Sequence, residues 1–220
     1  MAPRVLLLVV LLFVQPLGFP AASALARSRP AAVHESEPSP AAPLEAPAIC
    51  LLTPAASADA AGRVRALVPV DRPTIFARGD FAEIRLMRRG HPLWRLQADP
   101  GGSLQGPLAW PLPPLTAGET VLLRLRPLGV APEAFADVQL IAADASTLAA
   151  STQLRQRLGR DATAWLQAVL RELEASHTEL AMALLFDFDG PSSPSLDALR
   201  LEIHDRACAS PILSPASAVP

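Results

Sequence analysis

The sequence predicts an α+β domain: a small antiparallel β-sandwich or curled sheet, followed by two or three helices and a final strand. Two observations predict this class. Between residues 63 and 143, apolar and polar residues alternate through short segments that proline and glycine turns separate. Between residues 146 and 186, the apolar spacing changes to the three-and-four pattern of a helix. The change of period divides the domain into a β part and an α part.

The 220-residue chain is expected to have four parts. Residues 1–24 read as a signal peptide, because Arg4 precedes an apolar run over residues 5–14 and Ala22-Ser23-Ala24 offers a cleavage site. That run is too short to span a membrane, which takes roughly 20 residues. Residues 25–48 are rich in Pro and Ala and are expected to form a disordered linker. The single domain then covers residues 49–208, and residues 209–220 are a second disordered end.

Seven segments of the β part are expected to be strands, at residues 63–70, 74–78, 82–88, 93–98, 108–112, 120–126 and 136–143. The third and fourth make a hairpin around the turn at residues 89–92, with Ile84 and Leu86 on the apolar face and Glu83 on the polar face. Pro111 interrupts the segment 108–112, so that strand should lie at an edge or be bulged.

Two or three helices are expected next. The first covers residues 146–158 and ends at Gly159. Asp161 is a good N-cap for the second, which runs to about residue 175 and carries an apolar stripe. The third begins near Ser176, which has capping-box spacing to Glu179. The last element, residues 196–206, fits a strand or a helix. We favour the strand, because Leu, Leu and Ile at 199, 201 and 203 alternate with charged residues or His.

Three stretches resemble a known family: RPTIF at residues 72–76, PPLTAGE at 113–119 and AWLQAVL at 164–170. On these stretches residues 72–175, about half of the chain, resemble a family of secreted cyanobacterial proteins of unknown function. Those proteins have a signal peptide, a small β-domain and a helical segment. The resemblance implies a periplasmic or surface location and no known activity.

The composition excludes several kinds of chemistry. All 19 basic residues are Arg, and Lys and Asn are absent. The chain therefore has no Walker A lysine, no Schiff-base lysine and no acceptor for an N-glycan. Two Cys are too few for a four-Cys zinc site, and a formal charge of −2 gives no basic bias toward nucleic acid. We expect no cofactor, no metal site and no nucleic-acid partner.

Residues 184–190, Leu-Leu-Phe-Asp-Phe-Asp-Gly, resemble the first motif of the haloacid-dehalogenase-type phosphatases. The resemblance implies that Asp187 is a phosphoryl nucleophile, Asp189 an acid/base and Mg²⁺ the counter-ion. Three observations oppose it. Pro191 follows the Gly where that family has a Thr, only 30 residues remain after Gly190, and the chain has no parallel βαβ series. We interpret the match as coincidental and assign no catalytic residue.

Two sets of residues remain as candidates for binding and for stability. If the hairpin and strand 120–126 share a sheet, four arginines point to its polar face: Arg85, Arg95, Arg124 and Arg126. Such a face could hold a carboxylated or phosphorylated polymer. We favour the other interpretation, a solvated face whose arginines are balanced by Glu83 and Glu119. Cys50 and Cys208 lie at the two ends of the domain, and export would place them in an oxidising compartment, so we predict a disulfide.

The sequence thus indicates an exported, non-catalytic binding or assembly module of the cell envelope, in the periplasm or at the cell surface. Its partner would be an envelope protein or an anionic polymer, and no transmembrane segment remains after signal cleavage. Two alternatives stay open. One is an exported metal-dependent hydrolase or phosphatase that uses Asp187 and Asp189, and the other is a purely structural envelope protein.

Overall fold

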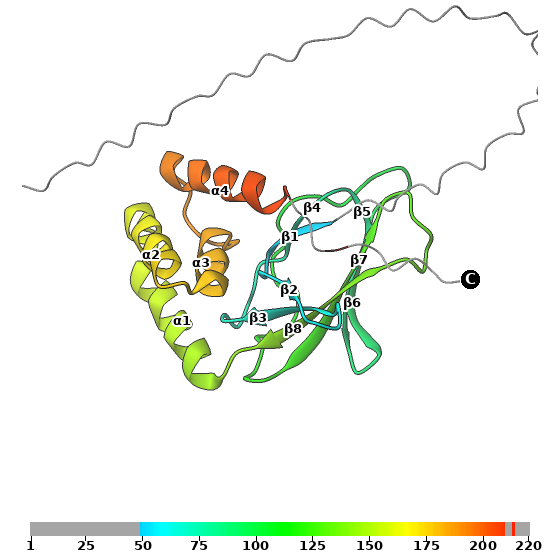
Figure 1. Ribbon diagram of the computed structural model, residues 1–220, viewed down its shortest axis with the longest axis horizontal. Coiled ribbons are helices and arrows are strands. Elements are labelled where there is room, and N and C mark those ends of the chain that lie inside the picture. Colours follow the sequence, from blue (N-terminus) through cyan, green and yellow to red (C-terminus); the bar gives the residue numbers. More distant parts are fainter. Residues whose placement is uncertain (1–48, 210–212, 214–220) are drawn as a thin grey trace, which may run out of the picture. The chain divides into compact units, whose positions relative to one another are not determined.

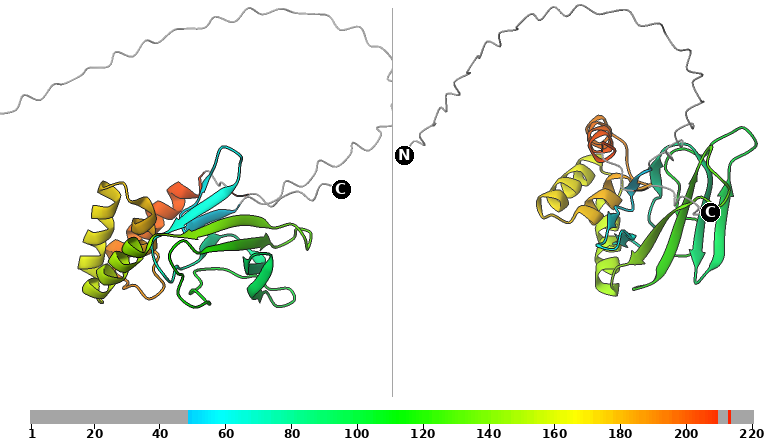
Figure 2. Two further views of the ribbon diagram at one scale, coloured as in Figure 1. Left: turned by 90° about the horizontal axis from the view of Figure 1, so that it is seen from below. Right: turned by 45° about the vertical axis from the view of Figure 1, so that its right-hand side comes forward.

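A computed structural model describes residues 49–209 and residue 213. The expected signal peptide, the linker and most of the expected tail lie outside these residues. The described part belongs to the α+β class, as predicted, with a six-stranded sheet, a two-stranded sheet and four helices. The helices gather on one side of the sheet, as Figures 1 and 2 show.

The elements follow one another as eight strands and then four helices. The strands are β1 (Cys50–Thr53), β2 (Ser57–Ala58), β3 (Val64–Val68), β4 (Phe76–Arg78), β5 (Phe81–Arg88), β6 (His91–Gln97), β7 (Thr120–Pro127) and β8 (Ala136–Ala142). The helices are α1 (Ala145–Leu158), α2 (Ala162–Glu174), α3 (Thr178–Leu185) and α4 (Pro194–Ala207).

The large sheet has the order β2-β3-β8-β7-β5-β6, and β1 pairs with β4 in the small sheet. The predicted hairpin β5–β6 is present, and β5 also pairs with β7, so the hairpin and the 120–126 segment do share a sheet. One pair departs from the antiparallel prediction: β3 and β8 are parallel. The chain leaves β3, completes β4 to β7, and returns alongside β3 in the same direction.

Two parts of the β prediction are wrong. The prediction missed strands β1 and β2, which precede the first expected strand. Residues 108–112 form no strand: Leu108 makes only an isolated bridge to Ile75, and the Trp110 indole Nε1 donates a hydrogen bond to the Pro113 carbonyl at 3.0 Å. Prolines at 107, 111, 113 and 114 explain this, because proline has no N–H to donate to a strand ladder.

The first two helices match the prediction closely. Asp161 caps α2, accepting hydrogen bonds from the backbone N–H groups of Thr163 and Ala164 at 2.9 and 3.2 Å. The expected capping box at Ser176 is absent. Ser176 instead adopts a left-handed conformation (φ 61°) just after α2, and α3 begins at Thr178.

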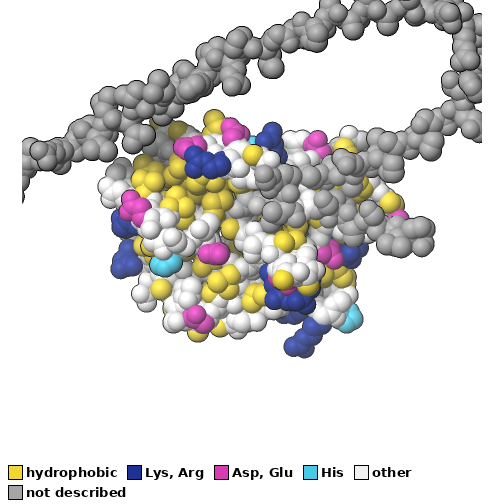
Figure 3. All heavy atoms as spheres, in the orientation of Figure 1, with side chains coloured by type: hydrophobic (Ala, Val, Ile, Leu, Met, Phe, Trp, Pro, Cys, Tyr) yellow, Lys and Arg dark blue, Asp and Glu magenta, His cyan; other side chains and the backbone are white. Residues whose placement is uncertain are grey.

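The final element is helix α4, not the strand that we favoured. Ser193 accepts a hydrogen bond from the Leu196 N–H at 3.3 Å, and Pro194 stands in the first turn, so both helix-start signals are present. Buried Leu196 anchors the helix, whereas Leu201 is 62% exposed. The alternation seen in the sequence therefore reflects a surface helix. Hydrophobic side chains remain visible between α4 and the helices beside it (Figure 3).

Strand β1 lies between two hydrophobic cores. Ile49 and Leu51 belong to the sheet core, which β3, β5, β7 and β8 also line. Cys50 and Leu52 belong to the helical core, together with residues of α2, α3 and α4. Leu213, which falls in the expected disordered tail, is buried in the sheet core and pairs with Ile49. Successive side chains of a strand point to opposite faces, so this one short strand contributes side chains to both cores.

Cys50 of β1 and Cys208, just after α4, form a disulfide. Their Sγ atoms lie 2.01 Å apart and their Cα atoms 5.3 Å apart, within the usual Cα range for a bridge. The bridge joins two residues 158 positions apart in the sequence and fixes the end of α4 to β1.

We predict that alkylation of the native protein without reductant labels neither Cys, and that denaturation with reductant exposes both. The double variant Cys50→Ser/Cys208→Ser should unfold at lower urea concentration, because the open chain gains entropy in the unfolded state. For a loop of this length, the chain-entropy model gives a stabilisation of at most about 5 kcal/mol. Two labelled thiols in the native protein, or a double variant of unchanged stability, would contradict the assignment.

Candidate functional site

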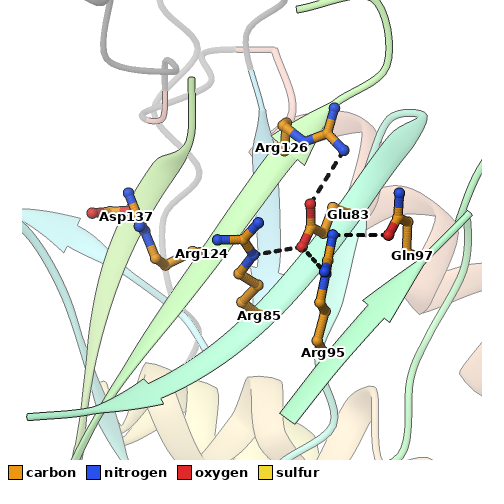
Figure 4. Close-up of polar contacts among 7 residues, drawn as sticks. All are labelled: Glu83, Arg85, Arg95, Gln97, Arg124, Arg126 and Asp137. Carbon is orange, nitrogen blue, oxygen red and sulfur yellow. Dashed lines mark hydrogen bonds and ion pairs between the residues drawn. The ribbon is translucent and has the colours of Figure 1, made fainter. Parts of the chain in front are cut away.

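The four predicted arginines meet on the polar face of the large sheet (Figure 4). Arg85 comes from β5, Arg95 from β6, and Arg124 and Arg126 from β7. Arg85 lies directly opposite Arg95 on one side and Arg124 on the other. Like charges at opposed positions repel one another, so this arrangement needs compensating anions. We call these four residues, with Glu83 and Asp137, the arginine cluster.

Glu83 is the central anion of the arginine cluster. Its side chain is only 2% exposed, and its carboxylate pairs with the guanidinium groups of Arg85, Arg95 and, at 3.2 Å, Arg126. Glu83 therefore does balance the arginines, as expected, but its carboxylate is buried rather than solvated, and Glu119 takes no part. Glu83 is buried by the arginines around it, and Glu119 pairs with Arg88 outside the cluster.

The aromatic ring of Phe135 supports three of the arginines. The guanidinium carbons of Arg85 and Arg124 each lie 4.6 Å from the ring centroid, and that of Arg126 lies 6.0 Å away. These distances suit cation–π attraction, which helps to hold like charges together. Sequence reasoning missed Phe135, since it stands just before β8, outside the alternating pattern of any strand.

The cluster keeps an excess of positive charge. Four guanidinium groups face two carboxylates, Glu83 and Asp137, the latter paired with Arg124 at 2.8 Å. Two positive charges are therefore left over. The buried Nε–H of Arg126 has no hydrogen-bond acceptor within the described residues, while the Arg95 side chain is 51% exposed. The excess charge and the half-exposed guanidinium of Arg95 can hold an anionic group at the surface, whereas the Arg126 Nε–H is buried away from it.

The ionisation of Glu83 reflects this environment. Burial of the carboxylate raises its pKa, but the hydrogen bonds from Arg85, Arg95 and Arg126 together outweigh burial and hold the pKa at about 2. Glu83 therefore stays ionised and remains a permanent counter-ion for the arginines at neutral pH.

Asp187 and Asp189 lie in the turn between α3 and α4, which we call the acidic turn (residues 187–190). The Asp187 Oδ2 atom pairs with Arg155 Nε at 2.8 Å, and its Oδ1 atom accepts the Asp189 backbone N–H at 2.9 Å. The turn is also fixed from outside, because the Phe188 N–H donates to Thr74 Oγ1 at 2.8 Å.

The acidic turn is not a convex surface loop. Asp187, Asp189 and Arg155 line a hollow of about 270 Å³ next to Trp165. Burial raises the pKa of Asp187, and the positive charge of Arg155 opposes that rise. The Asp187 side chain is thus only slightly exposed to solvent.

The surroundings of Asp187 differ from those that the phosphatase motif implies. Leu184 and Leu185 end helix α3, whereas that motif requires an apolar strand to deliver the nucleophile. Both carboxylate oxygens of Asp187 already have partners in the protein. Within residues 49–209 and 213, no three His, Cys, Asp or Glu side chains gather closely enough to bind a metal ion.

Comparisons with known proteins add no relative: no family model matches the chain, and no curated protein or solved structure is significantly similar to it. None of the helices in the described part has the length and apolar character that a membrane crossing requires.

We predict that Glu83→Gln lowers the free energy of unfolding at pH 7 by about 3 kcal/mol, because it leaves three guanidinium groups without their shared anion. The unfolded carboxyl binds a proton near its ordinary pKa of 4.5, and the folded one only near 2. The contribution of Glu83 is thus complete above pH 4.5 and is lost as the pH falls toward 2.

Urea unfolding at pH 7, 4.5 and 3 measures this contribution. The difference in the free energy of unfolding between the wild type and Glu83→Gln should become smaller as the pH falls. Glu202→Gln serves as the control, because Glu202 is an exposed partner of Arg206, and its loss should change stability by less than about 0.5 kcal/mol. A pH-independent difference would show that the ionised carboxylate is not what stabilises this face.

Proposed function

We propose that the chain is an exported, non-catalytic binding module that holds an anionic polymer of the cell envelope on its arginine cluster. The observation that carries the proposal is the excess positive charge on one sheet face, built from four arginines and only two carboxylates. Guanidinium groups bind carboxylate and phosphate oxygens through paired, directional hydrogen bonds. Three strands and the Phe135 ring fix the arginines, so little ordering is needed when a ligand binds.

Export is supported by two independent features. Residues 1–24 have the charge, the apolar length and the small residues of a cleaved signal peptide. The two Cys of the chain pair at disulfide distance, and such bridges persist in oxidising compartments. The periplasm and the cell surface both satisfy these conditions.

Arg95→Gln tests the proposal, with inorganic polyphosphate and polygalacturonate as the phosphorylated and carboxylated probes. Arg95 is the most exposed of the four arginines, so its loss should weaken binding of the favoured probe about tenfold, the effect of one charge-assisted hydrogen bond. Binding should also weaken with added salt, since salt screens exposed charges. Titration calorimetry measures both effects.

Arg157→Gln is the matched control, because it removes the same charge from an exposed position of α1. It should leave binding nearly unchanged. Equal losses in the two variants would indicate general charge attraction and contradict a built site. If neither probe binds the wild type, the anionic-polymer proposal fails, and a module that binds an envelope protein or a purely structural role would replace it.

A hydrolase that uses Asp187 and Asp189 is the second candidate. The observation that favours it is the hollow beside Arg155, where burial raises the pKa of Asp187. A carboxyl with a raised pKa in a concave site is a common mark of acid–base chemistry. Against it, Arg155 and the Asp189 N–H already occupy both oxygens of Asp187.

Asp187→Asn distinguishes the two candidates. A raised pKa means that the fold disfavours the ionised carboxylate, so a neutral amide should keep stability within about 1 kcal/mol at pH 7. Asp187→Ala also loses the acceptor for the Asp189 N–H and should cost about 1 to 2 kcal/mol. We expect binding of the anionic probe to persist in Asp187→Asn. A magnesium-dependent phosphatase activity that the wild type shows and this variant lacks would instead establish the hydrolase.

A further inference from the structure

We propose that a cavity beside α4 is a second binding site, which takes an uncharged, largely aromatic or aliphatic small molecule that carries one hydrogen-bond donor. The cavity, called here the α4 pocket, has a volume of about 520 Å³, within the range of small-molecule sites. It lies between α4, the acidic turn and β4, and it shares no residue with the arginine cluster. Its ligand is therefore independent of the proposed anionic polymer.

The wall of the α4 pocket is aromatic and aliphatic. Phe76 of β4 and Phe186, at the end of α3, meet edge to face with ring centroids 5.6 Å apart. Phe188, Leu201 and Pro107 complete the apolar part of the lining. Such a surface favours flat or branched apolar groups.

The pocket also contains the two most exposed large hydrophobic side chains of the described residues. Leu201 is 62% exposed and Phe188 is 53% exposed, and both line the same cavity. Apolar side chains left open to solvent around a hollow are typical of a binding site rather than of a core. A second hollow of about 560 Å³ lies along Leu199 and Ile203 of α4, but neither of these two most exposed side chains lines it.

The charged groups of the wall are already paired, which is why we infer an uncharged ligand. Asp187 pairs with Arg155, and Asp197 pairs with Arg200 at 2.6 Å. Arg200 also donates from Nε to the Leu185 carbonyl at 2.7 Å, so its guanidinium is fixed in the wall. A charged ligand would lose its hydration without gaining an unpaired counter-ion.

His204 supplies the polar contact. Its Nδ1 atom lies 3.0 Å from the Asp205 carboxylate, which can only accept a hydrogen bond when ionised, so Nδ1 carries the proton. In the neutral imidazole Nε2 is then an acceptor. His204 lines the α4 pocket, so a ligand with one N–H or O–H group matches this acceptor.

N-phenyl-1-naphthylamine is a suitable probe, because it is uncharged, aromatic and has a single N–H group. Its fluorescence should rise saturably when it is titrated into the purified protein. Leu201→Asp and Phe188→Ala should each weaken binding about tenfold or more. His204→Leu should weaken it about three- to tenfold, the usual effect of one hydrogen bond.

Leu170→Asp is the matched control, since Leu170 is a 42% exposed leucine of α2 that lies outside the cavity lining. It should bind the probe like the wild type. Because Leu170, Leu201 and Phe188 are all exposed, these variants are expected to fold, and circular dichroism checks this. Absence of saturable binding, unchanged binding in Leu201→Asp and Phe188→Ala, or an equal loss in Leu170→Asp would overturn the proposal. Unchanged binding in His204→Leu would overturn the hydrogen-bond assignment.

Discussion

The four-residue strand β1 is the constraint on which the rest of the domain depends. It is buried on both faces, so Leu51 closes the sheet core while Cys50 and Leu52 close the helical core. The disulfide from Cys50 to Cys208 then ties the end of α4 to the same strand. The sheet and the helical layer therefore meet at one strand, and the chain that closes the domain, at Leu213, returns to pair beside it at Ile49.

A second constraint acts on the polar face of the large sheet, which points away from the sheet core. The register of β5, β6 and β7 places three arginines side by side, an arrangement that repulsion would disfavour. The buried carboxylate of Glu83 and the ring of Phe135 offset that repulsion. These contacts fix the arginine side chains, and because two carboxylates face four guanidinium groups, the face keeps an excess of positive charge. Structural and binding roles are compatible here, since a fixed guanidinium needs little reordering to meet an anion.

Helix α4 is fixed to the rest of the domain at its two ends, and the α4 pocket lies along the part between them. Helix α4 is anchored near its start by buried Leu196 and tied at its end through Cys208, while most of its side chains remain exposed or half-buried. Hollows lie along both flanks of the helix. The acidic turn connects α3 to this helix, and the bonds of Asp187 to Arg155 and of Phe188 to Thr74 hold that turn against α1 and the β part.

The sequence by itself determined the elements whose pattern is local. Alternation specified β5, β6 and β7, and Asp161 with its apolar stripe specified α2, because capping and periodicity depend on residues close in sequence. The tertiary structure decided the rest. Strand β1 has no alternation because both of its faces are buried. Helix α4 resembles a strand because exposed Leu201 lies between Leu199 and Ile203, which pack against the helical core, and completes an alternating pattern. The burial of Glu83 depends on arginines up to 43 residues away, and the spacing of charges along one strand carries no information about such partners.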